Sequence, residues 1–242
     1  MSHSPFVLSL WVSSWAGMTA LFLGTIIAWV LVKVTFKGKW IAEGLVMAPL
    51  ILPPTLVGYY LLTLLGQRGL GPWIEQVFGF RVVFSVQGAI IAATIAALPL
   101  VVQTVQVSIA AISREIEEAG RIDGCTRWDL FWQIDLPLIR RGLLAGGILG
   151  FLRAMGDFGT TLMVAGNIPG RTQTMSMAIY DATQANNLSL ANQLALILIA
   201  VRLGEVRGVM TSAQANSVRS ELLGLADALE KVLAAWDNTA KH

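Results

Sequence analysis

Charged residues are scarce in this sequence. Asp, Glu, Lys and Arg make up 13% of its 242 residues, whereas they make up about 25% of a typical soluble domain. Hydrophobic residues account for 55%, and the mean hydropathy is +0.66. This composition excludes an ordinary soluble domain and predicts an integral membrane protein. The net charge of +2 gives no indication of a nucleic-acid partner, and we expect none.

Cysteine and histidine are scarce as well. Cys125 is the single cysteine, which excludes an intramolecular disulfide and a cysteine-based metal cluster. The two histidines, His3 and His242, lie near the two ends of the sequence, so we expect no metal site. No Lys or Arg precedes the long apolar run that starts at Phe6, which argues against a cleaved signal peptide.

Long apolar runs predict the membrane helices. A transmembrane helix needs about 20 apolar residues. The candidate runs are residues 6–32, 44–67, 82–113, 142–166 and 188–201, and the last is marginal because it has only 14 residues. We therefore predict an all-α fold, a polytopic membrane bundle of about five spans with a cytoplasmic coupling loop. Residues 6–201 are assigned to this transmembrane domain.

Residues 202–242 differ in composition from the predicted spans. They carry five basic and five acidic residues. Their apolar residues recur at spacings of three and four, which is typical of an amphipathic helix. We predict a cytoplasmic amphipathic tail that does not cross the membrane.

Two of the predicted spans contain residues that membrane helices normally lack. Pro53 and Pro54 interrupt the run 44–67, which cannot be one straight helix; it either lines a transport path or is merely kinked. Arg153 and Asp157 lie in the run 142–166, four residues apart and so on one predicted helix face. Charges inside a membrane are costly and mark function by default. This pair either neutralises itself or stabilises a gate in the path. The glycines of the same run predict close helix packing.

The stretch from Glu118 to Pro137 is the long polar segment between the apolar runs. The residues at fixed spacing in it are Glu118, Ala119, Gly120, Gly124, Ile134, Leu136 and Pro137. This pattern resembles the EAA loop of ATP-binding-cassette importer permeases, with Gly120 where that family has Ala. The resemblance implies a short cytoplasmic helix, a glycine turn and a second short helix, which dock in a cleft on the ATPase subunit and couple it to the membrane helices. The alternative is an amphipathic surface helix followed by a loop.

The residue types in this stretch favour a docking element independently of the family. Ile116, Ala119 and Gly120 share one predicted helix face, where small residues would let another chain approach closely. Gly124 is the expected C-terminal cap of the first helix, because glycine enters the left-handed conformation at little cost.

The second half of the stretch is rich in aromatic residues. Phe131 and Trp132 follow Trp128 by three and four residues, and the three predict an aromatic face that needs a partner. We expect Pro137 to end the second short helix.

Two further segments resemble one branch of the same family. Residues 150–182 contain GFLRAMGDFGTT and NIPGRTQT, and residues 48–62 read APLILPPTLVGYYLL. Both are similar to molybdate importer permeases, whose relatives carry sulfate or tungstate. The tail beyond residue 201 departs from this family, in which the last span continues apolar almost to the end of the chain.

The resemblance implies a complex in a prokaryotic plasma (inner) membrane. Its parts are two permease copies, two cytoplasmic ATPase subunits and an extracytoplasmic oxyanion-binding protein. The permease copies also contact membrane lipid. ATP and Mg are expected on the ATPase subunits and no cofactor on this chain, which has no GxxxxGK[ST] motif. The implied activity is inward transport of a tetrahedral dianion.

Weak contacts at several sites suit a path that must release its ion. The candidate contacts are Thr160, Thr161, Asn167 and Arg171, in addition to the two prolines and the charged pair described above.

Two other classes of protein also have polar or charged residues inside membrane spans. A channel or an ion-coupled carrier works without ATP and needs no docking loop. Intramembrane aspartyl proteases carry a Tyr-Asp pair on one span and Gly-x-Gly-Asp on a later one. That class is disfavoured here, because Tyr180-Asp181 comes after Met155-Gly156-Asp157 in the sequence. We therefore predict a transport subunit without an enzymatic site of its own.

Basic residues predict the orientation in the membrane. A cytoplasmic docking loop after three spans places the N-terminus outside. In this orientation the cytoplasmic segments are 33–43, which carries three Lys, and 114–141, which carries five Arg. The outer loops carry Arg68, Arg81 and Arg171. The excess of positive charge inside agrees with the usual rule for membrane proteins.

Overall fold

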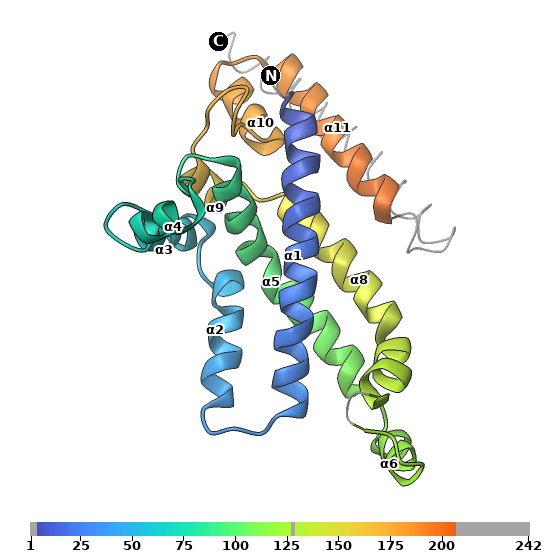
Figure 1. The fold of residues 1–242 in the computed structure, drawn as a ribbon. Coiled ribbons are helices and arrows are strands. Elements are labelled where there is room, and N and C mark those ends of the chain that lie inside the picture. Colours follow the sequence, from blue (N-terminus) through green and yellow to red (C-terminus); the bar gives the residue numbers. More distant parts are fainter. Residues whose placement is uncertain (1–3, 127–128, 207–242) are drawn as a thin grey trace. The chain divides into compact units, whose positions relative to one another are not determined.

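The computed structural model describes residues 4–126 and 129–206. Over these residues it contains helices and no strands, as predicted (Figure 1). The elements are α1 (Pro5–Lys33), α2 (Lys39–Ile51), α3 (Pro54–Leu65), α4 (Gly71–Phe78), α5 (Val86–Ala110), α6 (Arg114–Ile122), the π-helical turn η1 (Leu130–Asp135), α8 (Leu136–Met155), α9 (Gly159–Ala165), α10 (Met175–Gln184) and α11 (Leu188–Val206).

The chain divides into two compact units, Met1–Leu198 and Ile199–His242. Helices α1 to α10 and the first part of α11 belong to the first unit. Helix α11 continues through Arg202 to Val206, so the polar residues after Val201 do not end it. The rest of the predicted tail lies outside the described residues.

Two single helices and two bent pairs are long and apolar enough to cross a membrane. The single helices are α1 and α5. In one bent pair α3 turns by 114° from α2, and in the other α9 turns by 63° from the helix Leu130–Met155. Helix α11 contributes a shorter apolar stretch, Leu188–Ala200. The predicted all-α membrane bundle is confirmed, and two of its candidate spans are bent pairs of helices.

The centre of the first unit is formed by α1, α5 and α8, which pack side by side (Figure 1). Small residues allow this close approach. A Cβ atom added to Gly24 of α1 would lie 2.8 Å from Val101 Cγ1 of α5, and one added to Gly150 of α8 would lie 2.7 Å from Val101 Cγ2. Glycine packing in the fourth predicted span is therefore confirmed.

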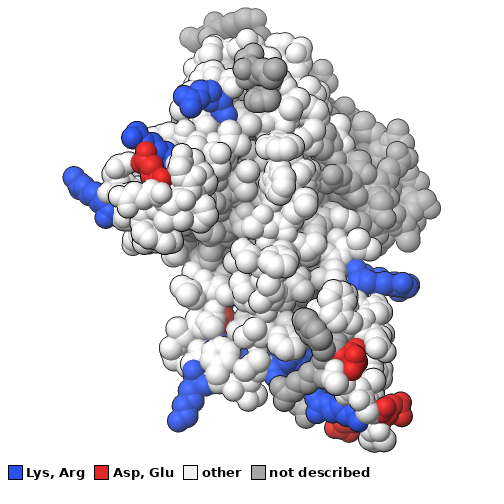
Figure 2. Space-filling view, viewed as in Figure 1, with Lys and Arg blue, Asp and Glu red and all other residues white. Residues whose placement is uncertain are grey.

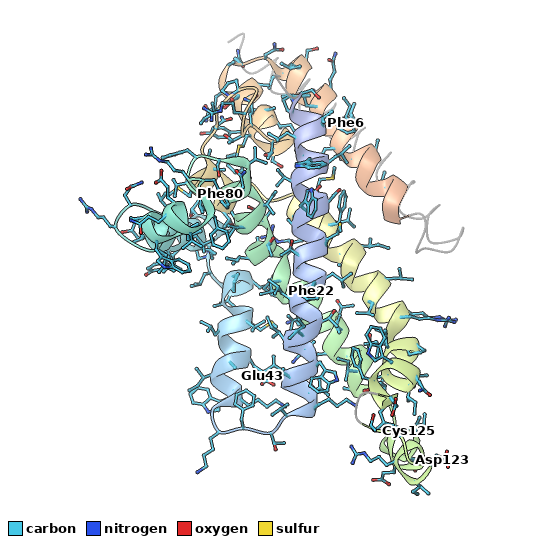
Figure 3. The ribbon with its side chains drawn as sticks, viewed as in Figure 1. Phe6, Phe22, Glu43, Phe80, Asp123 and Cys125 are labelled. Carbon is cyan, nitrogen blue, oxygen red and sulfur yellow. The ribbon has the colours of Figure 1, made fainter. Side chains whose placement is uncertain are left out.

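Charged side chains gather at two separate parts of the face drawn in Figure 2. One lies over α6 and the turn between α1 and α2, and the other lies over α4. Figure 3 shows Phe6 at the opposite end of the first unit from Asp123 and Cys125. Apart from basic side chains at its right edge, the band between the two parts is nearly free of charge in Figure 2, as expected of a surface that faces lipid.

Candidate functional site

Helix α6 ends in a left-handed glycine, as predicted. Gly124 has φ +87°. The Gly124 N–H donates to Arg121 O at 3.1 Å, and the Cys125 N–H donates to Gly120 O at 3.0 Å. These two hydrogen bonds form a Schellman motif, which satisfies carbonyl groups at the end of the helix. The reversal between the two halves of the docking stretch therefore depends on this glycine.

Gly120 is buried inside the stretch and does not offer a surface to another chain. An added Cβ atom would lie 2.7 Å from Leu130 Cδ2 and 2.8 Å from Ile134 Cδ1. The small residue thus lets α6 pack on η1. The expectation that Gly120 itself admits a partner is wrong, because Leu130 and Ile134 of the same chain cover it. Glu118 and Ala119 are exposed, and so are Ile116 at 44% and Ile122 at 85%.

A capping box starts the second half of the stretch. The Thr126 N–H and hydroxyl donate to Asp129 Oδ2 at 2.9 and 2.6 Å, and the Asp129 N–H donates to Thr126 Oγ1 at 3.2 Å. These hydrogen bonds hold the pKa of the Asp129 carboxyl below its usual value. The T-x-x-D pattern was present in the sequence and could have been recognised as a helix start.

Pro137 does not end the second helix, so that prediction is wrong. The chain is helical from η1 into α8, and Pro137 lies in the first turn of α8. Proline is tolerated there, because it lacks the N–H group that an interior helical position would need to bond. Leu136 is half-buried and Pro137 is exposed. The docking stretch is therefore continuous with a membrane helix and is not followed by a loop.

The aromatic residues of the stretch do not form one exposed face. Phe131 packs edge-on against Trp29 of α1, with ring centroids 6.5 Å apart, and against Trp132 at 5.4 Å. Trp132 is 56% exposed and remains a candidate contact for a partner. Trp128 lies outside the described residues.

A second contact between the stretch and α1 was not predicted from the sequence. Lys33 Nζ, at the end of α1, lies 3.8 Å from Asp135 Oδ2 in η1. A cleft of about 510 Å³ adjoins this pair and is lined also by Trp29, Ile109 and Arg121. Lys33 and Asp135 are far apart in sequence, so no local pattern could have paired them.

The two broken spans cross each other at their breaks. A Cβ atom added to Gly159, at the start of α9, would lie 3.1 Å from Pro54 Cβ at the start of α3. One added to Gly58 of α3 would lie 2.7 Å from Met163 Cβ and 3.0 Å from Thr160 O. The structure thus brings the Pro53–Pro54 break together with the break at residues 156–158. We call this contact between α3 and α9 the half-helix crossing.

Asp157 lies in the second break, and its carboxylate holds the start of α9. Asp157 Oδ2 accepts from the Thr161 N–H at 2.9 Å and from the Thr161 hydroxyl at 2.6 Å. Asp157 Oδ1 accepts from the Thr160 hydroxyl at 3.2 Å and from Arg153 Nη1 at 3.4 Å. Asp157 is 3% exposed and both threonines are 1% exposed. The hydroxyl groups of Thr160 and Thr161 are therefore engaged by Asp157 in this structure.

Arg153 and Asp157 do not share a face of one continuous helix, so that prediction is wrong. Helix α8 ends at Met155 and α9 begins at Gly159. The Asp157 carboxylate stabilises the break, because it accepts from the Thr161 N–H and from the hydroxyls of Thr160 and Thr161 in the first turn of α9. The two residues still pair, as one of the two interpretations held.

Asn167 and Arg171 belong to a different part of the structure, the loop between α9 and α10. Asn167 Nδ2 donates to Asp181 Oδ1 at 2.7 Å, and Gln173 Nε2 donates to Asp181 Oδ2 at 2.6 Å. Asp181 of α10 thus fixes this loop, a role that the sequence did not indicate. Arg171 is exposed.

A family model matches most of the chain. Residues 20–204 match the family described as binding-protein-dependent transport system inner membrane component. The matched region contains both the docking stretch and the half-helix crossing.

Several curated proteins are similar over most of their length. The putative molybdenum transport system permease protein YvgM of Bacillus subtilis is 42% identical over 189 residues, which are 78% of this chain and 83% of that protein. The molybdenum transport system permease protein ModB of Escherichia coli K12 is 39% identical and covers 81% of this chain and 86% of its own. A probable sulfate transport system permease protein cysT of Anthoceros angustus is 35% identical over 84% of this chain and 73% of that protein.

A solved structure shares the fold. A chain from inward-facing crystal structures of the MetNI methionine ABC transporter superposes with a TM-score of 0.60 at 16% identity. The match covers 85% of this chain and 96% of the other.

Proposed function

Because the chain belongs to the family of binding-protein-dependent transport system inner membrane components, we propose that it is the membrane-spanning subunit of an ATP-driven molybdate importer. Its residues 114–137 dock a cytoplasmic ATPase subunit. The observation that carries this proposal is the docking stretch, which combines a left-handed Gly124 with exposed Glu118 and Ile122 at one end of the membrane bundle.

The ATPase subunit binds ATP and Mg and hydrolyses the nucleotide in the proposed complex. Helix α6 offers it apolar and acidic side chains, since Ile116, Ile122 and Glu118 are exposed. An apolar side chain that is 85% exposed, as Ile122 is, fits a contact that a partner covers. Glu118 supplies a charge that sets the orientation of the contact.

The proposed complex contains two copies of this chain, two ATPase subunits and an extracytoplasmic oxyanion-binding protein. The N-terminus lies outside and α6 lies in the cytoplasm. The excess of basic residues in segments 33–43 and 114–141 supports this orientation. The orientation also places Arg68, Arg81 and Arg171 on the side where the binding protein delivers its anion.

The transport path runs past the half-helix crossing in this proposal. Broken helices inside a membrane are tolerated where they line a cavity or pack on protein. The break at residues 156–158 places the carboxylate of Asp157 and the guanidinium of Arg153 within the bundle, 3.4 Å apart. Pro53, Pro54, Thr160 and Thr161 shape the crossing, and the hydroxyls of the two threonines bond Asp157. Asn167 and Arg171 act at the outer entrance.

Molybdate is proposed as the cargo because relatives described as molybdenum permeases reach 42% and 39% identity, above 35% for the sulfate relative. Sulfate and tungstate have the same tetrahedral dianionic form and are the competing substrates.

Reconstitution of the chain in vesicles with its ATPase and binding protein tests the proposal. We expect radioactive molybdate to accumulate only when ATP is present on the ATPase side, and unlabelled tungstate to compete more strongly than sulfate. Accumulation without an ATPase subunit would instead establish a channel or an ion-coupled carrier. Stronger competition by sulfate would correct the substrate and leave the transport class intact.

A further inference from the structure

Two neighbouring faces of η1 make contact with two different helices. Leu130 and Ile134, four residues apart, pack on Gly120 of α6. Phe131 and Asp135, each one residue further along the chain, contact Trp29 and Lys33 of α1. The π-helical turn therefore lies between the docking helix and the end of a membrane helix.

The contact with α1 combines an aromatic pair and an ion pair. Trp29 and Lys33 are four residues apart on α1, so they lie on the same helix face. The Asp135 side chain is 8% exposed and the Lys33 side chain is 20% exposed. An ion pair at this depth is screened less by water than one at the surface.

The cleft beside the ion pair shows how α6 is connected to the bundle. The cleft of about 510 Å³ is lined by Arg121 from α6, by Lys33 and Trp29 from α1, and by Ile109 from α5. This space lies between α6 and the ends of α1 and α5. Helix α6 thus contacts η1, and η1 in turn contacts α1 beside this cleft.

We propose that the Lys33–Asp135 ion pair is a mechanical link, through which η1 moves the cytoplasmic end of α1 when the ATPase displaces the docking stretch. The inference rests on the proposed function, because it assumes that an ATPase drives the stretch. Lys33 and Asp135 act as positioning residues. They touch neither nucleotide nor transported ion, and they set how much transport each hydrolysed ATP produces.

The test measures molybdate uptake per ATP hydrolysed in vesicles that contain the complete complex. The key variant is the double substitution Lys33→Met with Asp135→Leu, because it removes both charges of the pair at once and replaces them with apolar side chains. We expect this variant to keep its ATPase subunit and its ATP hydrolysis. Its uptake per ATP should fall about tenfold, within the range known for contacts along a coupling route.

Two further variants separate a link from simple charge neutralisation. Lys33→Asp should lose uptake, and the charge exchange Lys33→Asp with Asp135→Lys should restore most of it. The matched control is the Lys39–Glu43 pair of α2, with 3.9 Å between Lys39 Nζ and Glu43 Oε1 and side chains 37% and 45% exposed. Charge reversal at Lys39 should leave uptake per ATP unchanged, since exposed pairs contribute little.

The outcomes distinguish the link from the proposed function. Wild-type uptake per ATP in the Met–Leu variant would show that the pair serves only to neutralise Asp135, and would overturn the link. An equal loss in the Lys39 control would also overturn it. If the wild-type chain retains no ATPase subunit, the proposed function itself fails, and this is detected before any variant is compared.

Discussion

Replacement of Gly124 gives the sharpest test of the docking stretch. Gly124 has φ +87°, and an added Cβ atom would meet nothing within 4 Å. A side chain there has ample space, so any effect arises from the backbone conformation and not from a steric clash with a neighbour. The informative substitutions are Gly124→Asn, Gly124→Ala and Gly124→Val.

The magnitude follows from the cost of the left-handed conformation. A residue with a Cβ atom pays roughly 1–2 kcal/mol there, and a β-branched residue up to about 3 kcal/mol. Asn enters this region more easily than other residues with a side chain. A cost of 1–2 kcal/mol lowers the equilibrium constant between the docking conformation and its alternatives by about 5- to 30-fold. The affinity for the ATPase falls by up to the same factor, because only that conformation binds.

The assay is retention of the ATPase subunit by the detergent-solubilised chain, measured over a range of ATPase concentrations. We expect retention to weaken in the order Gly, Asn, Ala, Val at position 124, with normal membrane levels throughout. The matched control is Gly79→Val. Gly79 caps α4 with φ +74°, and an added Cβ atom also meets nothing within 4 Å. This control has the same backbone cost far from the docking stretch, so retention should be unchanged.

Normal retention and uptake in Gly124→Val would refute the assignment of residues 114–137 as the docking element. Equal weakening in the Gly79 control would show that the effect is a general loss of stability.

Three further predictions concern the rest of the chain. In a cysteine-free background, a single cysteine at Ser2 should be labelled from outside and one at Ser113 should not; the reverse pattern would contradict the orientation. Asp157→Asn should destabilise the purified chain by about 1–3 kcal/mol, and more than Arg153→Met does, because the Asp157 carboxylate also accepts from three donors of α9. Thermal unfolding measures the stability of both variants, and an equal loss in the two would indicate that Asp157 only pairs with Arg153. Deletion of 207–242 should leave membrane levels unchanged on immunoblots, and loss of the protein would show that its insertion requires the tail.

The features that the sequence predicted are those with a local cause. The apolar runs follow from composition, and the break at Pro53–Pro54 follows from the missing N–H groups of proline. The left-handed Gly124 follows from the glycine itself. Each of these can be recognised in a few consecutive residues.

The features that the sequence did not predict depend on distant neighbours or on competition between two local structures. Helical spacing identified the helix face that contains Gly120. It could not show that Leu130 and Ile134 cover this glycine. The apolar run around Asp157 predicted an uninterrupted helix, because the sequence does not reveal that this carboxylate bonds the start of α9. The pairing of Lys33 with Asp135 requires the fold of α1 against η1.

The half-helix crossing has a consequence for how this protein can change during evolution. Gly58 faces Met163 Cβ, and Gly159 faces Pro54 Cβ, with no room for a methyl group at Gly58. A smaller side chain at position 163 does not relieve this contact, because alanine keeps its Cβ atom and the backbone oxygen of Thr160 stays 3.0 Å away. Gly58 should therefore be retained in relatives that keep this crossing, whichever residue stands at position 163.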